Sequence, residues 1–123
     1  MSKAVLIAES NEMLSRALSD TLSFMGFSII GKTPLRSRVV ALAEKTKPDL
    51  LLFDLALSGE GMAGLSDIQR LKQQLPELKI LLLGFHESTD QIETKIADAG
   101  FNGLWNKCEG RACLIEKLKL LFP

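Results

Sequence analysis

Three side chains suited to handling a phosphoryl group follow short apolar runs in this chain. Glu9 and Asp54 each come directly after such a run, and Lys107 follows a third one near the end of the sequence. An aspartate attacks a phosphoryl group only where a divalent cation neutralises the crowded anions and donors hold the transferred oxygens. That chemistry needs two or more carboxylates and a positively charged side chain around one aspartate. The chain has these side-chain types, provided that the fold brings them together.

Five apolar runs are too short for helices, and their length predicts β-strands. They lack the alternation of polar and apolar residues that a half-exposed strand shows. We therefore expect both faces of each strand to be buried, as in a parallel sheet. The predicted strands are residues 4–8, 27–30, 50–53, 80–83 and 101–105.

Segments with apolar residues at three- and four-residue steps lie between and after these runs. This spacing predicts amphipathic helices that each turn one apolar stripe onto a sheet. Ser88-Thr89-Asp90-Gln91 has the pattern of a capping box and predicts the start of the fourth helix, while Gly100 predicts its end. The predicted helices cover residues 14–25, 35–43, 65–75, 92–99 and 114–121.

Strict alternation of strand and helix predicts right-handed crossovers and a doubly wound (βα)5 parallel sheet of the α/β class. All predicted elements belong to this one unit, so we expect one domain over residues 1–123, and a further domain after the fifth helix stays open. In such a sheet the ligand site lies beyond the carboxyl ends of the strands. Glu9, Asp54 and Lys107 should therefore converge on one pocket.

Composition excludes several classes of function. The chain has 15 basic and 15 acidic residues, so no net field attracts nucleic acid or an anionic membrane. No apolar run is long enough for a membrane span or a signal segment. Cys108 and Cys113 fit neither a disulfide framework nor a zinc site, and free thiols suit a reducing compartment. We expect a cytoplasmic protein that binds neither nucleic acid nor membrane directly.

Three segments resemble, in order and spacing, the landmark segments of the receiver domains of bacterial two-component signalling. They are Lys3 to Asn11, Pro48 to Leu55 and Gly100 to Lys107, and the resemblance extends over the whole chain. It implies the flavodoxin-like strand order 2-1-3-4-5. It also implies a phosphorelay receiver, which is the acceptor half of a transfer and not a turnover enzyme.

The resemblance assigns a role to each candidate residue. Asp54 corresponds to the phosphoacceptor, and Lys107 to the lysine that pairs with the phosphoryl group. Glu9 is the first residue of the acidic pair, so Mg²⁺ would be held by Glu9, Asp54 and, by position, the main-chain carbonyl of Ala56. The implied partners are a sensor histidine kinase or a phosphotransfer protein, with room for a homodimer through the face made by helix four, strand five and helix five.

Three positions depart from the family pattern. Ser10 stands where the second acid of the pair is usual, and a neutral hydroxyl is a weaker ligand for Mg²⁺ than a carboxylate. Gly84 replaces the hydroxyl residue that bonds the new phosphoryl group. Leu104 replaces the aromatic residue that changes pose between states. These departures indicate an atypical receiver whose metal binding and conformational response are both weakened.

Two alternatives to a phosphorylated receiver stay open. One is a pseudo-receiver that keeps the fold as a protein-interaction module without phosphorylation. The other is a small Rossmann-like nucleotide-binding domain, because Gly59 to Gly64 reads G-x-G-x-x-G between a strand and a helix. That fingerprint turns immediately off its strand, whereas here four residues separate Asp54 from Gly59, so the nucleotide reading is the weaker one.

Overall fold

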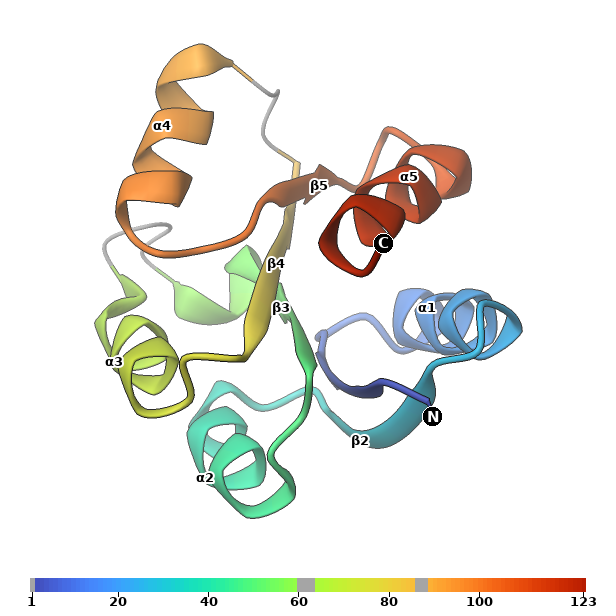
Figure 1. Ribbon diagram of the computed structural model, residues 1–123, viewed down its shortest axis with the longest axis horizontal. Helices are drawn as coiled ribbons and strands as arrows, with labels where there is room; N and C mark the ends of the chain where they lie inside the picture. Colours follow the sequence, from blue (N-terminus) through green and yellow to red (C-terminus); the bar gives the residue numbers. More distant parts are fainter. Residues whose placement is uncertain (1, 60–63, 86–88) are drawn as a thin grey trace.

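The computed structural model describes residues 2–59, 64–85 and 89–123, as five strands, five α-helices and one short 3₁₀ helix (Figure 1). In chain order the elements are β1 (Ala4–Ala8), α1 (Glu12–Phe24), β2 (Ser28–Thr33), α2 (Arg36–Thr46), β3 (Leu50–Asp54), the 3₁₀ helix η1 (Leu55–Ser58), α3 (Ser66–Gln74), β4 (Lys79–Gly84), α4 (Asp90–Asp98), β5 (Leu104–Asn106) and α5 (Arg111–Leu121).

The strands form one parallel sheet in the order β2-β1-β3-β4-β5. This confirms the predicted doubly wound α/β fold and its strand order. The chain leaves β1 for α1 on one face of the sheet and leaves β3 for α3 on the other (Figure 1). Ligands of such sheets bind where connections diverge in this way, beyond the carboxyl ends of the strands.

Two apolar cores hold the sheet between its helices. Leu51 and Phe53 of β3 pack in the core shared with α2, α3 and α4, whereas Leu50 and Leu52 face the core shared with α1 and α5. Figure 1 shows these two sets of helices on opposite sides of the sheet. Burial of one such leucine or phenylalanine contributes roughly 1.5–3 kcal/mol. The ends of β1 and β3 are therefore rigidly placed.

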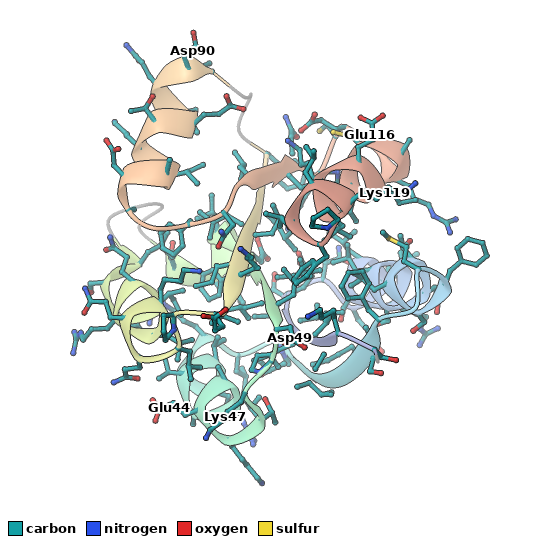
Figure 2. All side chains as sticks on the ribbon, in the orientation of Figure 1. Glu44, Lys47, Asp49, Asp90, Glu116 and Lys119 are labelled. Carbon is teal, nitrogen blue, oxygen red and sulfur yellow. The ribbon has the colours of Figure 1, made fainter. Side chains whose placement is uncertain are left out.

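Charged side chains cover the outer surfaces of the helices. Glu44 and Lys47 lie at the end of α2, Asp90 at the start of α4 and Lys119 on α5, and all four are exposed (Figure 2). Asp49 instead ties the start of β3 to β1, because its Oδ2 accepts a hydrogen bond from the Ala4 amide at 2.8 Å. In the described segments, no helix combines the length and the apolar character needed to cross a bilayer.

Strand β2 departs from the prediction in length and in burial. The apolar run ended at Ile30, but main-chain pairing with β1 continues to Thr33. Its residues alternate between exposed and partly buried until Thr33, so the expected burial on both faces is wrong for this edge strand. The register also shifts between Val5 and Leu6, which leaves Ile30 opposite neither of them. This is the geometry of a β-bulge.

Strand β5 is shorter than the predicted 101–105. Phe101 is buried, as an apolar residue should be, but it lies in the loop before the strand. Gly103 separates the two with a φ of 149°, a backbone conformation that favours glycine. The apolar run therefore contains a core residue, a turn and a strand, which hydrophobicity alone does not distinguish.

Two short features differ from the sequence pattern. The N-cap of α4 is Thr89, whose hydroxyl accepts a hydrogen bond from the Ile92 amide at 3.2 Å. The predicted capping box beginning at Ser88 is thus displaced by one residue, and Ser88 itself lies outside the described residues. The 3₁₀ helix η1 was not predicted, because four residues are too few to show a helical period.

Candidate functional site

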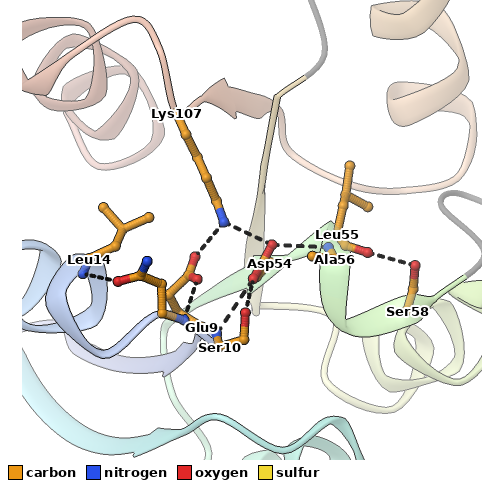
Figure 3. A network of polar contacts seen from close by, with 9 residues as sticks. Glu9, Ser10, Leu14, Asp54, Leu55, Ala56, Ser58 and Lys107 are labelled. Carbon is orange, nitrogen blue, oxygen red and sulfur yellow. Dashed lines mark hydrogen bonds and ion pairs between the residues drawn. The ribbon is translucent and has the colours of Figure 1, made fainter.

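The structure brings Glu9, Asp54 and Lys107 together at the carboxyl edge of the sheet (Figure 3). The Lys107 ammonium lies 2.9 Å from Oε1 of Glu9 and 3.0 Å from Oδ1 of Asp54. The exposed fractions of the three side chains are 0% for Glu9, 1% for Asp54 and 8% for Lys107. One ammonium therefore joins two buried carboxylates that come from different strands.

Glu9 is fixed by the end of β1 and by the turn into α1. Its amide donates to the Thr33 carbonyl at 3.1 Å, and its Oε2 accepts a hydrogen bond from the Asn11 amide at 2.9 Å. Asn11 then caps α1, with its side-chain oxygen accepting from the Leu14 amide at 3.0 Å. The carboxylate is thus held close to the helix N-terminus, where the dipole favours negative charge.

Asp54 is the last residue of β3, and both of its carboxylate oxygens accept hydrogen bonds. Oδ1 accepts from the Ala56 amide at 3.0 Å, so that the side chain also caps η1. Oδ2 accepts from the Ser10 hydroxyl at 3.0 Å and, at the longer distance of 3.5 Å, from the Ser10 amide. These donors fix the orientation of the carboxylate at the mouth of the site (Figure 3).

Lys107 is placed by the parallel pairing of β4 and β5. Gly84 pairs with Asn106, and the Lys107 amide continues this pairing by donating to the Gly84 carbonyl at 2.7 Å. The side chain then runs back across the strand ends to Glu9 and Asp54 (Figure 3). On its way the ammonium lies 5.3 Å from the centre of the Phe85 ring.

The shared environment moves the two carboxyl pKa values in opposite directions. Burial raises the pKa of Glu9 above its ordinary value, against the effects of the Asn11 hydrogen bond and of the adjacent Lys107 ammonium. Burial also acts to raise the pKa of Asp54, but hydrogen bonds with Lys107 and Ala56 outweigh it and hold that pKa below its ordinary value. Asp54 is therefore the more readily ionised of the two carboxyl groups.

The residues present fit a divalent cation that is held by few protein ligands. In the segments that the structure describes, no group of three or more His, Cys, Asp or Glu side chains could hold a metal ion. The Glu9 Oε1 atom is nevertheless buried without a well-directed hydrogen bond, although the Lys107 ammonium is 2.9 Å away. Mg²⁺ usually keeps several waters and takes only one or two carboxylates. The two carboxylates of Glu9 and Asp54 are thus enough to hold Mg²⁺. A receiver with an acid at position 10 as well would supply three.

Sequence reasoning missed the donors and the aromatic ring around the three charged residues. Ser10 was read only as a weak metal ligand, but its hydroxyl bonds the Asp54 carboxylate. Asn11 precedes a helix and has the residue type of an N-cap, a signal that was there to find. Phe85 follows the fourth predicted strand and so belongs to this edge of the sheet, but its residue type predicted no role there, and it is 71% exposed.

The three residues that depart from the family pattern lie beside Asp54, at the end of β4 and at the start of β5. Ser10 is exposed beside Asp54, and Gly84 is the buried last residue of β4. Leu104 starts β5 and is buried with Ile96 of α4 in the larger core. The glycine motif does not turn off its strand, since η1 separates β3 from Gly59. Its central residues, 60–63, lie outside the described residues.

Residues 5–119 of the chain match the family model of the response regulator receiver domain. The chain belongs to the receiver domain family. Receiver domains are signalling modules of two-component systems and generally not enzymes. As a family they are phosphorylated on an aspartate, bind Mg²⁺ at that site and interact with histidine kinases or phosphotransfer proteins.

This receiver domain is similar to part of each of several longer regulators. It is 24% identical over 119 residues to the response regulator GacA of Pseudomonas viridiflava. This match covers 96% of this chain and 54% of the relative. Over 84 residues it is 32% identical to the response regulator protein VraR of Staphylococcus aureus, covering 68% of this chain and 39% of the relative. The chain thus spans about half the length of the GacA relatives that it matches.

A solved structure shows the same fold. The crystal structure of a two-component response regulator of the LuxR family from Aurantimonas sp. SI85-9A1 superimposes with a TM-score of 0.83. The match covers 98% of this receiver domain and 85% of the other chain at 18% sequence identity. At that identity the likeness establishes the fold alone, so the roles of individual residues rest on the geometry of the site.

Proposed function

We propose that this receiver domain accepts a phosphoryl group on Asp54 from a sensor histidine kinase or a phosphotransfer protein. The observation that carries the proposal is the Lys107 ammonium, which bridges the buried carboxylates of Glu9 and Asp54 at 2.9 and 3.0 Å. A lysine so nearly buried is seldom found without a partner or a task. Here it lies where charge would accumulate during phosphoryl transfer.

The transfer needs an ionised nucleophile and a cation that can follow the charge. A carboxylate oxygen of Asp54 forms a bond to phosphorus, while the bond from phosphorus to the donor histidine nitrogen breaks and its electron pair stays with the imidazole. Lys107, already 3.0 Å from Asp54 Oδ1, can then pair with the transferred oxygens. The lowered pKa of Asp54 keeps the attacking group ionised at neutral pH.

A metal ion has a defined place in this proposal. Glu9, Asp54 and the main-chain carbonyl of Ala56 are the groups that would hold Mg²⁺, which when bound neutralises the charge on the phosphoryl oxygens. Ser10 adds no charge to this set, and its hydroxyl must release or share Asp54 Oδ2 for that oxygen to attack. We therefore regard the domain as an atypical receiver with weak metal binding.

The partner surface of the proposed receiver is the face formed by α4, β5 and α5. A groove of about 300 Å³ runs between these elements, bordered by Ile96, Leu104 and Leu120. A homodimer would bury this face. The domain would act in the cytoplasm through protein contacts. It would not bind nucleic acid or membrane itself, because its acidic and basic residues are equal in number and create no net attraction to polyanions.

An intact-mass measurement tests the phosphoacceptor role. The chain is incubated with acetyl phosphate and Mg²⁺, and we expect the mass of one phosphoryl group to be added. Asp54→Asn should abolish the gain, while Asp20→Asn, which removes an exposed carboxylate from α1, should leave it unchanged. No gain in the unaltered protein at millimolar donor would contradict the proposal.

The second candidate function is a pseudo-receiver that binds a partner without phosphorylation. Three observations favour it: Ser10 occupies the Asp54 oxygen Oδ2, Gly84 offers no hydroxyl, and Leu104 is packed against α4 in the core. The same mass measurement separates the two candidates, because a pseudo-receiver gains no phosphoryl group. Partner binding would then be equal for the unaltered protein and Asp54→Asn.

A further inference from the structure

Phe85 is a large apolar side chain that lies in solvent at the mouth of the site. It follows β4 directly and is 71% exposed. Its ring centre is 5.3 Å from the Lys107 ammonium, which is within the range of a cation–π contact. Because Phe85 is mostly exposed, it contributes little to the apolar core. Its contact with Lys107 therefore suggests a role in the site.

The sheet register creates this contact. Gly84 pairs with Asn106 across β4 and β5, and the Lys107 amide donates to the Gly84 carbonyl. The next residues along the two strands, Phe85 and Lys107, are therefore neighbours beyond the last pair. Gly84 has no side chain with which to contact the lysine, and at this strand end Phe85 supplies the side chain that does.

We propose that Phe85 is a positioning residue, whose ring closes the solvent side of Lys107 and keeps its ammonium between Glu9 and Asp54. Two carboxylates hold the ammonium at 2.9 and 3.0 Å, and the ring of Phe85, whose centre is 5.3 Å away, adds a cation–π attraction. The Lys107 side chain is 8% exposed, as this enclosure requires. Its effect on phosphoryl transfer rests on the proposed function, but the positioning itself does not.

The ring is suited to this role because it attracts a cation without accepting a conventional hydrogen bond. A carboxylate or a carbonyl in its place would compete with an incoming phosphoryl group for the protons of the ammonium. The electrostatic attraction of a ring face is broad and permits the ammonium to shift. Phe85 can therefore hold Lys107 in register in the resting site and still let it turn toward new negative charge.

The first test reads the ammonium directly and needs no phosphorylation. Proton exchange of the Lys107 ammonium with water is measured by ¹H–¹⁵N NMR in the unaltered protein, Phe85→Leu and Phe85→Trp. We expect exchange about two- to fivefold faster in Phe85→Leu, the factor that corresponds to loss of an exposed cation–π contact, and unchanged or slower exchange in Phe85→Trp. Equal exchange in Phe85→Leu and the unaltered protein would overturn the proposal.

A matched control separates the contact from the general loss of an exposed ring. Phe24 is 83% exposed at the end of α1, and its ring lies over Arg111 instead of Lys107. Phe24→Leu should leave the exchange of the Lys107 ammonium unchanged. Faster exchange in both leucine variants would show a nonspecific effect and would also count against Phe85.

The second test measures the rate of phosphorylation by acetyl phosphate in the same variants. We expect Phe85→Leu to be about two- to fivefold slower than the unaltered protein, and Phe85→Trp to restore the rate. Faster phosphorylation of Phe85→Leu would mean that the ring is a steric gate, which overturns the positioning role. If no variant is phosphorylated but the exchange rates differ as expected, the proposed function fails and the positioning of Lys107 by Phe85 stands.

Discussion

The charge of the site depends on three side chains. With both carboxyls ionised, Glu9 and Asp54 contribute two negative charges and Lys107 one positive charge, so the net charge is −2 + 1 = −1. An acid at position 10 would change this sum to −2. The residue type at position 10 therefore has a large effect on the attraction between the site and a divalent cation. Here that residue is Ser10, whose hydroxyl oxygen lies 3.0 Å from Asp54 Oδ2.

Ser10→Asp should tighten Mg²⁺ binding. A direct anionic oxygen replaces a neutral hydroxyl, and one added unit charge near a cation contributes on the order of a few kcal/mol at an effective dielectric of about 20. We expect an affinity at least about tenfold higher, measured by titration of Mg²⁺ against Trp105 fluorescence or amide shifts. Ser10→Asn, which adds no charge, is the control. Equal affinity in the aspartate variant would place Ser10 away from the ion.

Glu9→Gln should remove a pH dependence of stability above pH 4.5. The folded pKa of Glu9 lies above the ordinary 4.5, so its favourable contribution is complete below that value and is lost as pH rises through the folded pKa. The unaltered protein should lose stability relative to Glu9→Gln over that rise, by at most about 1.4 kcal/mol per pH unit. Urea unfolding without Mg²⁺ between pH 4.5 and neutrality measures the difference.

Asp54 gives the opposite sign in a separate pH range. Its pKa lies below the ordinary 3.8, so its contribution is present above that value and is lost as pH falls through the folded pKa. The Glu9 and Asp54 effects therefore do not overlap. Parallel stability curves for the unaltered protein and Glu9→Gln above pH 4.5 would show that burial does not raise the Glu9 pKa.

At this scale the sequence predicts the charged residues but not what surrounds them. Glu9, Asp54 and Lys107 could be predicted to meet, because each follows an apolar strand and parallel strands end at one edge. The Ser10 hydroxyl bond and the Phe85 contact could not, because both depend on side-chain directions at strand ends. A pattern of apolar residues contains no information on those directions.

At the scale of elements, β4, β5 and α4 should be uncoupled from Asp54. Gly84 has no hydroxyl to bond a phosphoryl group, and Leu104 is packed with Ile96 in the core instead of carrying a ring that changes pose. A ligand shifts an equilibrium only through contacts that differ between two states. β4 and β5 each lack a side chain that usually makes such contacts.

Beryllofluoride, a mimic of the phosphoryl group, should leave this segment almost unmoved. With Mg²⁺ present we expect amide shifts near Asp54 and Lys107, and only small shifts across residues 90–105, in ¹H–¹⁵N spectra. Asp54→Asn serves as the control that does not bind the mimic in this way. Large shifts along α4 would reveal that another element has replaced the usual switch.

Leu104→Ala should destabilise the fold by about 2–5 kcal/mol. The side chain is 6% exposed, so its removal leaves a cavity between β5 and α4. Leu120 borders the same groove but is 82% exposed, and Leu120→Ala should change the free energy of unfolding by no more than about 0.5 kcal/mol. Chemical denaturation of both variants measures the contrast. Similar small losses would mean that the Leu104 side chain contributes little to the core.

Element prediction succeeded where an element is buried on both faces and was less accurate at the edges. β1, β3 and β4 are almost wholly buried, so their apolar runs mark them closely. β2 extends past its apolar run because main-chain pairing, not hydrophobicity, carries it to Thr33. The run around Phe101 spans a turn as well as the start of β5, because Phe101 before the turn is buried like Leu104 and Trp105 of the strand.

At the scale of the whole molecule, association should not depend on the state of Asp54. The α4–β5–α5 face is the surface proposed for a homodimer, and it is the face that Gly84 and Leu104 should separate from the site. We expect the molar mass from light scattering to be the same with and without beryllofluoride and Mg²⁺ at equal protein concentration. A mimic-dependent dimer would contradict this expectation.

The bulge in β2 has a consequence for solubility during folding and storage. A sheet edge presents unpaired amides and carbonyls, and a long flat apolar edge is a template for aggregation between chains. Here one edge is the three-residue β5, and the other is β2, kinked opposite Val5 and Leu6 and carrying the exposed Lys32. Neither edge offers a straight apolar strand to a second chain, so we expect the bulge to disfavour growth of the sheet into a fibril.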